Sequence, residues 1–176
     1  LTSDNVVKSI NDNLDYILKL MPEVGDMFGF EHNHPHHHLD VWNHTLLALK
    51  NSDNDFEVRL TLLLHDIGKP FSFQDEEVRR FRGHQQKSKE IASNILKRLN
   101  CPLELSDRIL YLIETHDTLI DIEECNRENL DLILKRLSIQ YADALAHHPE
   151  KVGQRIIKLN NVKEQIDEKF LMVNKR

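Results

Sequence analysis

The sequence contains few of the residues that mark disulfide-rich or membrane-spanning proteins. Its 176 residues include only two cysteines, Cys101 and Cys125, which are too few and too isolated for a disulfide framework or a thiolate zinc site. We therefore expect a reducing compartment, with the cytoplasm as the simplest location. No apolar run approaches the ~20 residues that a membrane-spanning helix needs, so we expect no membrane partner.

An excess of basic residues is also missing. The chain has 29 acidic and 23 basic residues and a formal net charge of -6, which gives no general electrostatic reason to bind nucleic acid. A small phosphorylated substrate, such as a nucleotide, in a locally positive site remains compatible with this balance. The length fits a single domain, residues 1–176, that can bury a sizeable core.

Glycine and proline are scarce, with five of each, so long stretches of the chain have no helix breaker. Apolar residues recur at helical spacing and no convincing alternating strand pattern is present, which predicts an all-α bundle of about six to eight helices. The expected helices cover residues 4–21, 39–51, 54–66, 84–99, 104–117, 127–147 and 151–172. The first and the last, an amphipathic helix, are expected to pack on the rest.

Local signals set several of these boundaries. Pro22 is expected to stop the first helix, and Asn54 with Glu57 forms a plausible capping box for the third. Gly68 is expected to end that third helix in the left-handed conformation. Residues 69–82 have no clear periodicity, which predicts a loop over one end of the bundle that could cover a site.

The most informative local feature is the pair His65-Asp66, which follows the apolar run 60–64. Burying an ionised carboxylate without a partner is very costly, and a metal ion is the natural partner for an adjacent imidazole and carboxylate. The pair therefore predicts a metal site at the inner end of the third helix.

Other ligand-type residues lie on inner faces of other predicted helices. His44, His84 and His116 keep three- or four-residue spacing with apolar residues of their own helices. Asp143 lies in the helix that is apolar almost all round and is therefore expected to be central. Taken singly, such a histidine is more often hydrogen-bonded to a carbonyl, and such an aspartate is as often a cap or ion-pair partner. Taken together with His65-Asp66, they are best explained by a metal centre.

The His-rich run at residues 32–38 follows no helical face, so most of it is expected to be a solvated loop. His37 and His38 lie nearest in sequence to the helix that carries His44. Either could reach the mouth of the site and serve as the acid for a leaving group.

The ordered set His44, His65-Asp66, His84, His116 and Asp143 resembles the HD-domain superfamily of metal-dependent phosphohydrolases, in its HDIG form. The surrounding segments agree as well, at residues 40–45, 63–70, 81–84, 113–117 and 141–144. They are similar to the HD domains attached to bacterial tRNA nucleotidyltransferases and to their stand-alone relatives. The resemblance covers residues 38–146, and the sequence has no obvious nucleotidyltransferase segment, so tRNA processing is not implied.

The resemblance implies one or two divalent transition-metal ions. The first would be held by His44, His65, Asp66 and Asp143, and the second by Asp66, His84 and His116. Imidazole and carboxylate ligands suit Mn, Fe, Co, Ni or Zn. A metal-bound hydroxide would then attack a phosphomonoester or phosphodiester, with Asp66 as the bridging catalytic residue.

Basic residues around the signature carry a weaker signal. Lys69 is either a catalytic phosphate contact or an ordinary solvated lysine, and the sequence gives both equal weight. Arg79, Arg80 and Arg82 could reach substrate, yet acidic neighbours could pair with them at a solvated surface, so we leave them outside the predicted site.

Two other functions are compatible with the same ligands. The HD fold also hosts di-iron oxygenases, and a metal-binding regulatory module without turnover would need the same residues. Lys69 and the neighbouring arginines mildly favour a phosphorylated substrate.

Overall fold

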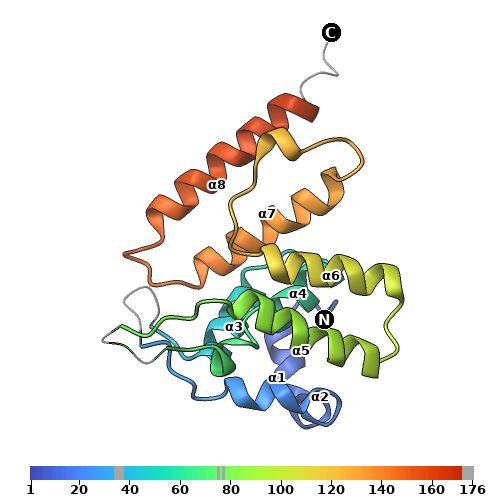
Figure 1. Ribbon diagram of the computed structural model, residues 1–176, viewed down its shortest axis with the longest axis vertical. Coiled ribbons are helices and arrows are strands. Elements are labelled where there is room, and N and C mark those ends of the chain that lie inside the picture. The colour runs from blue at the N-terminus through green and yellow to red at the C-terminus, as the bar shows by residue number, and fades with distance from the viewer. Residues whose placement is uncertain (34–37, 75, 77, 172–176) are drawn as a thin grey trace.

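The computed structural model describes residues 1–33, 38–74, 76 and 78–171, and within them the chain is all α (Figure 1). The helices are α1 (Val6–Asp12), α2 (Leu14–Leu20), α3 (Val41–Lys50), α4 (Phe56–Leu64), α5 (His84–Arg98), α6 (Leu103–Thr115), α7 (Leu130–Leu145) and α8 (Gly153–Ile166). Short 3-10 turns lie at Pro22–Met27, Lys69–Phe71 and Ile122–Glu124, and a π turn follows α8 at Asp167–Leu171. The fold class expected from the sequence is confirmed.

Two hydrophobic clusters organise the chain, and α7 contributes to both. The larger cluster contains residues of all the helices from α1 through α6 and also Ile139 and Ala142 of α7. The smaller cluster joins α7 to α8 and includes Leu137 and Leu159. Figure 1 shows α8 running beside α7, apart from the helices around α5. As expected, α7 is the central helix, since it contributes to both clusters, but it is not buried all round, because Leu134 and Leu145 are 40% and 49% exposed.

The single first helix predicted for residues 4–21 is wrong, because the chain breaks at Asn13. The backbone of Asn13 has φ -119° and ψ 19°, and its amide donates to the carbonyl of Ile10 rather than to the residue four positions back. Its side-chain amide donates to the carbonyl of Ser9 at 2.8 Å, a local bond that competes with continued helix. Pro22 does end this part of the chain, since it opens the Pro22–Met27 turn.

The cap of α4 lies one residue later than predicted. Asp55, rather than Asn54, is the N-cap, and its carboxylate accepts from the Val58 amide at 3.0 Å. The same carboxylate pairs with Lys135 of α7 at 2.5 Å, so one side chain caps α4 and links it to the central helix.

We expect Asp55→Ala to lower the free energy of unfolding by about 1 kcal/mol, as is usual for a lost N-cap. Asp55→Asn keeps the capping oxygen and loses only the ion pair, so it should cost about 0.5 kcal/mol. Urea unfolding of the two variants measures both effects. Equal losses in the two variants would contradict the capping role.

The pH dependence of this contact follows from its charge. Burial tends to raise the pKa of Asp55, but the hydrogen bonds from Lys135 and Val58 outweigh it and lower the pKa below its ordinary value of 3.8. The charge therefore stabilises the fold above that ordinary value and stops doing so as pH falls through the lower folded-state pKa. The difference in unfolding free energy between wild type and Asp55→Asn should therefore shrink as the pH falls through this range.

Gly68 ends the turn after α4 for a different reason from the one predicted. Its φ is -83°, in the right-handed region, so the left-handed C-cap prediction is wrong. A Cβ at this position would lie 2.4 Å from the Ser88 amide nitrogen and 2.7 Å from the His84 carbonyl oxygen. The Gly68 amide also donates to the Ser88 hydroxyl at 2.9 Å. Glycine is needed here because α5 approaches the backbone directly.

Candidate metal centre

The residues predicted as ligands come together at one end of their helices. His44 lies in α3, His65 and Asp66 directly follow α4, His84 opens α5, His116 directly follows α6, and Asp143 lies in the last turn of α7. All six are buried, with exposed fractions between 0% and 7%. Six polar residues from five helices thus share one interior position.

Each of the four histidines is oriented by a backbone carbonyl at its Nδ1 atom. His65 Nδ1 lies 2.7 Å from the Leu62 oxygen, and His116 Nδ1 lies 2.7 Å from the Ile113 oxygen. The Nδ1 atoms of His84 and His44 contact carbonyls at 2.8 and 3.2 Å. A carbonyl can only accept, so each Nδ1 carries a proton and donates. In a neutral ring this leaves the Nε2 lone pair for a metal.

Those Nε2 atoms converge on Asp66, and its two oxygens face different histidines. Oδ2 lies 3.2 Å from His65 Nε2 and 3.7 Å from His44 Nε2. Oδ1 lies 3.4 Å from His84 Nε2 and 3.9 Å from His116 Nε2. One carboxylate therefore separates two pairs of imidazoles, which is the arrangement that a bridging ligand requires.

Asp143 belongs to the His44 and His65 side of the centre. Its Oδ1 atom lies 2.9 Å from His44 Nε2 and 3.7 Å from His65 Nε2. Its Oδ2 atom accepts a hydrogen bond from Arg155 of α8 at 2.9 Å. Asp143 therefore places a second carboxylate beside the first pair of histidines.

These residues fit a metal ion. Two groups of three residues each have their ligand atoms within 4.8 Å of one another. One group is His44, His65 and Asp66, and the other is Asp66, His84 and His116. His65 Nε2 and Asp66 Oδ1 are buried and have no hydrogen-bond partner among the described residues. Such atoms are costly to bury unless something coordinates them, and one cation in each group would satisfy one of them.

The electrostatics of the site demand positive charge near the two carboxylates. Burial opposes a charged ring at His65, but Asp66 and Asp143 outweigh it and raise the pKa of His65 to about 10. Burial likewise favours neutral carboxyl groups, yet neighbouring cationic groups hold the pKa of Asp66 and of Asp143 well below the ordinary value. A divalent ion would meet the same demand.

The other pair of histidines is held neutral. Burial is the main cause that lowers the pKa of His116 to about 4, and repulsion from His65 adds to it. Burial also lowers the pKa of His84, against the opposing effect of Asp66. Their Nε2 atoms lie 3.4 Å apart. Neutral rings are the state in which imidazole binds a metal.

Lys69 is buried, so its interpretation as an ordinary solvated lysine is wrong. Its ammonium donates to Asp66 Oδ2 at 2.7 Å and lies 3.1 Å from His32 Nε2. The Nδ1 atom of His32 lies 2.8 Å from the Leu39 carbonyl, so Nδ1 donates there and Nε2 accepts from Lys69. Burial and the nearby Lys69 charge lower the pKa of His32 to about 2, which keeps the ring neutral.

A cavity of ≈ 320 Å³ opens onto this centre. Asp66, Asp143, His84 and His116 line it on the ligand side. Basic side chains line it as well, namely Lys69, Arg79, Arg80, Arg82 and Arg155. Arg79, Arg80 and Arg82, which were left outside the predicted site, therefore belong to its walls, although Arg80 also pairs with its acidic neighbour Glu76 at 3.3 Å, as the alternative interpretation expected. The described residues 69 and 79–82 of the predicted loop line the site.

The chain matches the family model for the HD domain over residues 36–164. It belongs to the HD-domain family. HD domains are typically metal-dependent phosphohydrolases, and the buried His and Asp groups of this HD domain are candidate metal sites.

Curated relatives of this HD domain include two tRNA nucleotidyltransferases and a Multifunctional CCA protein. The chain is 38% identical over 104 residues to the CC-adding tRNA nucleotidyltransferase of Thermus thermophilus, which covers 54% of this chain and 24% of the relative. It is 32% identical over 120 residues to the A-adding tRNA nucleotidyltransferase of Deinococcus radiodurans, with coverages of 61% and 28%. It is 31% identical over 117 residues to the Multifunctional CCA protein of Shewanella denitrificans, with coverages of 63% and 28%. The matched region thus spans about a quarter of these relatives.

Besides the arginines near residue 80, the sequence analysis missed three residues of the HD domain site. His32 belongs to the His-rich run that was expected to be mostly solvated, yet it is 1% exposed and holds Lys69. His147 and Arg155 line the cavity and lie beyond the expected boundary of the core at residue 146. His147 follows Asp143 by four residues, and that helical spacing was the signal that could have identified it.

Of the two histidines predicted as the acid for the leaving group, the structure describes only His38. The ring of His38 lies 5.5 Å from the ring of His148, and His38 is not among the described residues that line the cavity. The alternative acid, His37, lies outside the described residues.

None of the described helices is both long and apolar enough to cross a membrane.

Proposed function

We propose that this HD domain is a metal-dependent phosphohydrolase that cleaves a phosphomonoester or phosphodiester of a nucleotide-like small molecule. The observation that carries the proposal is the pairing of a two-carboxylate, four-imidazole centre with a cavity whose walls are basic. Cationic side chains around a metal centre favour a substrate with several anionic oxygens. The chain's overall charge of -6 makes this local concentration of arginine more telling.

Two ions would be held by residues already placed. The first would bind His44, His65, Asp66 and Asp143, and the second would bind Asp66, His84 and His116. Mn, Fe, Co, Ni and Zn suit these nitrogen and oxygen ligands. When bound, such ions supply Lewis acidity toward a phosphoryl oxygen and lower the pKa of water.

The chain's own residues supply orientation and charge. The Nδ1 hydrogen bonds fix the imidazole rings, so the ligand geometry is set before substrate arrives. Lys69, held between Asp66 and His32, presents an ammonium at the cavity wall where it would contact a phosphate oxygen. Arg80 and Arg82 line the same wall and would bind the nonbridging oxygens.

The basic wall favours hydrolysis over the other two functions. An oxygenase acting on an uncharged substrate has no need for four arginines around its cavity, and a regulatory module has no need for a cavity that reaches the ligands. The same ligands nevertheless suit iron, so the test includes oxygen consumption.

The test is a phosphoester panel on metal-loaded protein. Protein purified without a His tag is stripped, reconstituted anaerobically with Mn, Fe, Co, Ni or Zn, and assayed with phosphomonoesters and phosphodiesters of nucleosides and of simple alcohols. We expect hydrolysis of at least one nucleotide ester with at least one of these metals, and its loss when a chelator removes the metal.

Each other outcome has a defined meaning. Oxygen consumption with iron and a small polyol, in the absence of any hydrolysis, would replace the proposal with an oxygenase. Full metal content with no turnover in either assay would indicate a regulatory module.

A further inference from the structure

A second cavity adjoins the metal-site cavity on the side of α8. Its volume is ≈ 460 Å³, and it shares three lining residues with the first cavity, namely Asp117, His147 and Arg155. Because they share these walls, the two cavities lie side by side. A group bound at the metal centre would therefore have its remaining atoms directed either to solvent or into this second cavity.

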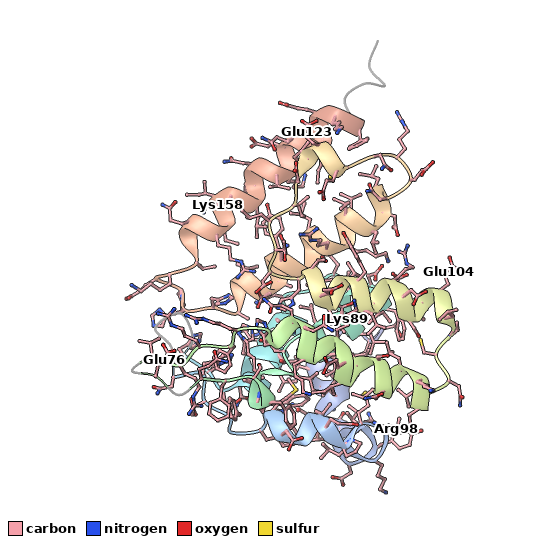
Figure 2. All side chains as sticks on the ribbon, viewed as in Figure 1. Glu76, Lys89, Arg98, Glu104, Glu123 and Lys158 are labelled. Atoms are coloured by element: carbon pink, nitrogen blue, oxygen red, sulfur yellow. The ribbon has the colours of Figure 1, made fainter. Side chains whose placement is uncertain are left out.

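Basic side chains of the α8 region line the second cavity in a row. Lys151 lies in the turn before α8, and Arg155 and Lys158, three residues apart, share one side of α8. Figure 2 labels Lys158 on α8. Asp117 is the one carboxylate among the described lining residues, and it accepts a hydrogen bond from the Gln85 amide at 2.7 Å. The three cations therefore outnumber the acidic groups of the cavity.

Two of these three cations form no ion pair within the described part of the chain. Arg155 uses one nitrogen to hold Asp143 Oδ2, and Lys151 and Lys158 have no acidic partner within 4 Å there. Other exposed lysines, such as Lys87 and Lys163, do pair with acidic neighbours. The second cavity thus presents an unmatched positive surface directly beside the first.

We infer that the second cavity is a binding subsite for a second phosphate group of the substrate. The inference rests on the proposed function and narrows it: the preferred substrate is a nucleotide-like ester with two separated phosphates, one at the metal centre and one against Lys151 and Lys158. Arg155 links the two subsites because it lines both cavities and holds Asp143. Exposed Leu119 and half-buried Val152 line the same cavity and offer apolar contacts to the part of the substrate between the phosphates.

A binding experiment tests this subsite without turnover. Propane-1,3-bisphosphonate and propylphosphonate carry two anionic groups and one, and their carbon–phosphorus bonds are not phosphoesters. We expect metal-loaded wild-type protein to bind the bisphosphonate about tenfold more tightly by calorimetry, and a Lys151→Gln/Lys158→Gln variant to lose about fivefold of that preference. Binding of propylphosphonate should be unchanged. High salt should weaken the preference because the lysines are exposed.

A matched control separates the local effect from net charge. Lys50→Gln/Lys97→Gln also removes two positive charges, but from exposed positions that line neither cavity. It should keep the wild-type preference for the bisphosphonate over propylphosphonate. An equal preference in wild type and the Lys151/Lys158 variant, or an equal loss in the control, would overturn the subsite.

A kinetic experiment separates the subsite from the proposed function. With adenosine 3′,5′-bisphosphate and adenosine 5′-monophosphate as substrates, the Lys151→Gln/Lys158→Gln variant should lose kcat/KM for the bisphosphate only. Hydrolysis of both substrates with no change in the variant overturns the subsite and leaves the hydrolase intact. A bisphosphonate preference that depends on the lysines, with no hydrolysis of any ester, supports the subsite and overturns the hydrolase.

Discussion

Asp66→Asn is expected to empty both metal positions at once. Asp66 is the residue that the two ligand groups share, and its two oxygens face different pairs of histidines. The substitution keeps the shape of the side chain and removes the charge that a bridging ligand must provide. Metal per chain, measured by mass spectrometry of dialysed protein, should fall to background. If the hydrolase proposal holds, kcat/KM should fall at least about a thousandfold, because metal ions contribute several kcal/mol to transition-state stabilisation.

A comparison with His84 makes this expectation specific to bridging. His84 belongs to one ligand group, so His84→Ala should remove about half of the bound metal rather than all of it. Asp107→Asn, at an exposed position in α6, should bind metal as the wild type does. Unchanged metal content in Asp66→Asn would refute the site itself, and an equal loss in Asp66→Asn and His84→Ala would refute its division into two positions.

Among the glycine-to-alanine substitutions, each of which adds one methyl group, Gly68→Ala is expected to destabilise the fold most. The added Cβ would meet backbone atoms, at 2.4 Å from the Ser88 nitrogen and 2.7 Å from the His84 oxygen, and backbone cannot move aside as a flexible side chain can. Overpacking of this kind costs about 1–3 kcal/mol and occasionally more. Relief requires α5 to shift at its first turn, which carries His84, so metal content should also fall.

Gly153→Ala is the matched control for this exchange. Gly153 opens α8, and a Cβ there would meet nothing within 4 Å. Alanine is the better helix former by up to about 1 kcal/mol, so this variant should be as stable as wild type or slightly more stable. Chemical denaturation of both variants checks the contrast. A Gly68→Ala protein as stable as Gly153→Ala would show that α5 does not need the close approach.

The helices and the inward residues could be predicted from sequence because both depend on local spacing. Helical periodicity placed His44, His84, His116 and Asp143 on inner faces, and the structure brings them to one point. The same local reasoning assigned Gly68 the wrong role, because the reason for that glycine is a backbone from 20 residues further along the chain. Sequence spacing carries no information about such a tertiary approach.

Residues outside regular helices were harder to predict. His32 lies in a segment without periodicity, and only the bond to Lys69, 37 residues away, makes it part of the site. The arginines near residue 80 looked like a solvated charge cluster, since exposed charges usually are. Their position on the cavity wall depends on how the 69–82 segment folds over the bundle, which no local pattern specifies.

The four histidine rings differ in whether a local or a distant carbonyl orients them. His65, His84 and His116 each donate to the carbonyl three residues earlier, so each is aligned by its own turn as soon as that turn forms. His44 instead donates to Ala146, 102 residues away, and is aligned only when the end of α7 docks on α3. Ion capture at the His44 position therefore depends on long-range chain closure, whereas two local turns prepare the His84 and His116 rings. A folding intermediate in which α4, α5 and α6 are packed but α7 is not docked would therefore contain the Asp66, His84 and His116 group without the carbonyl that aligns His44.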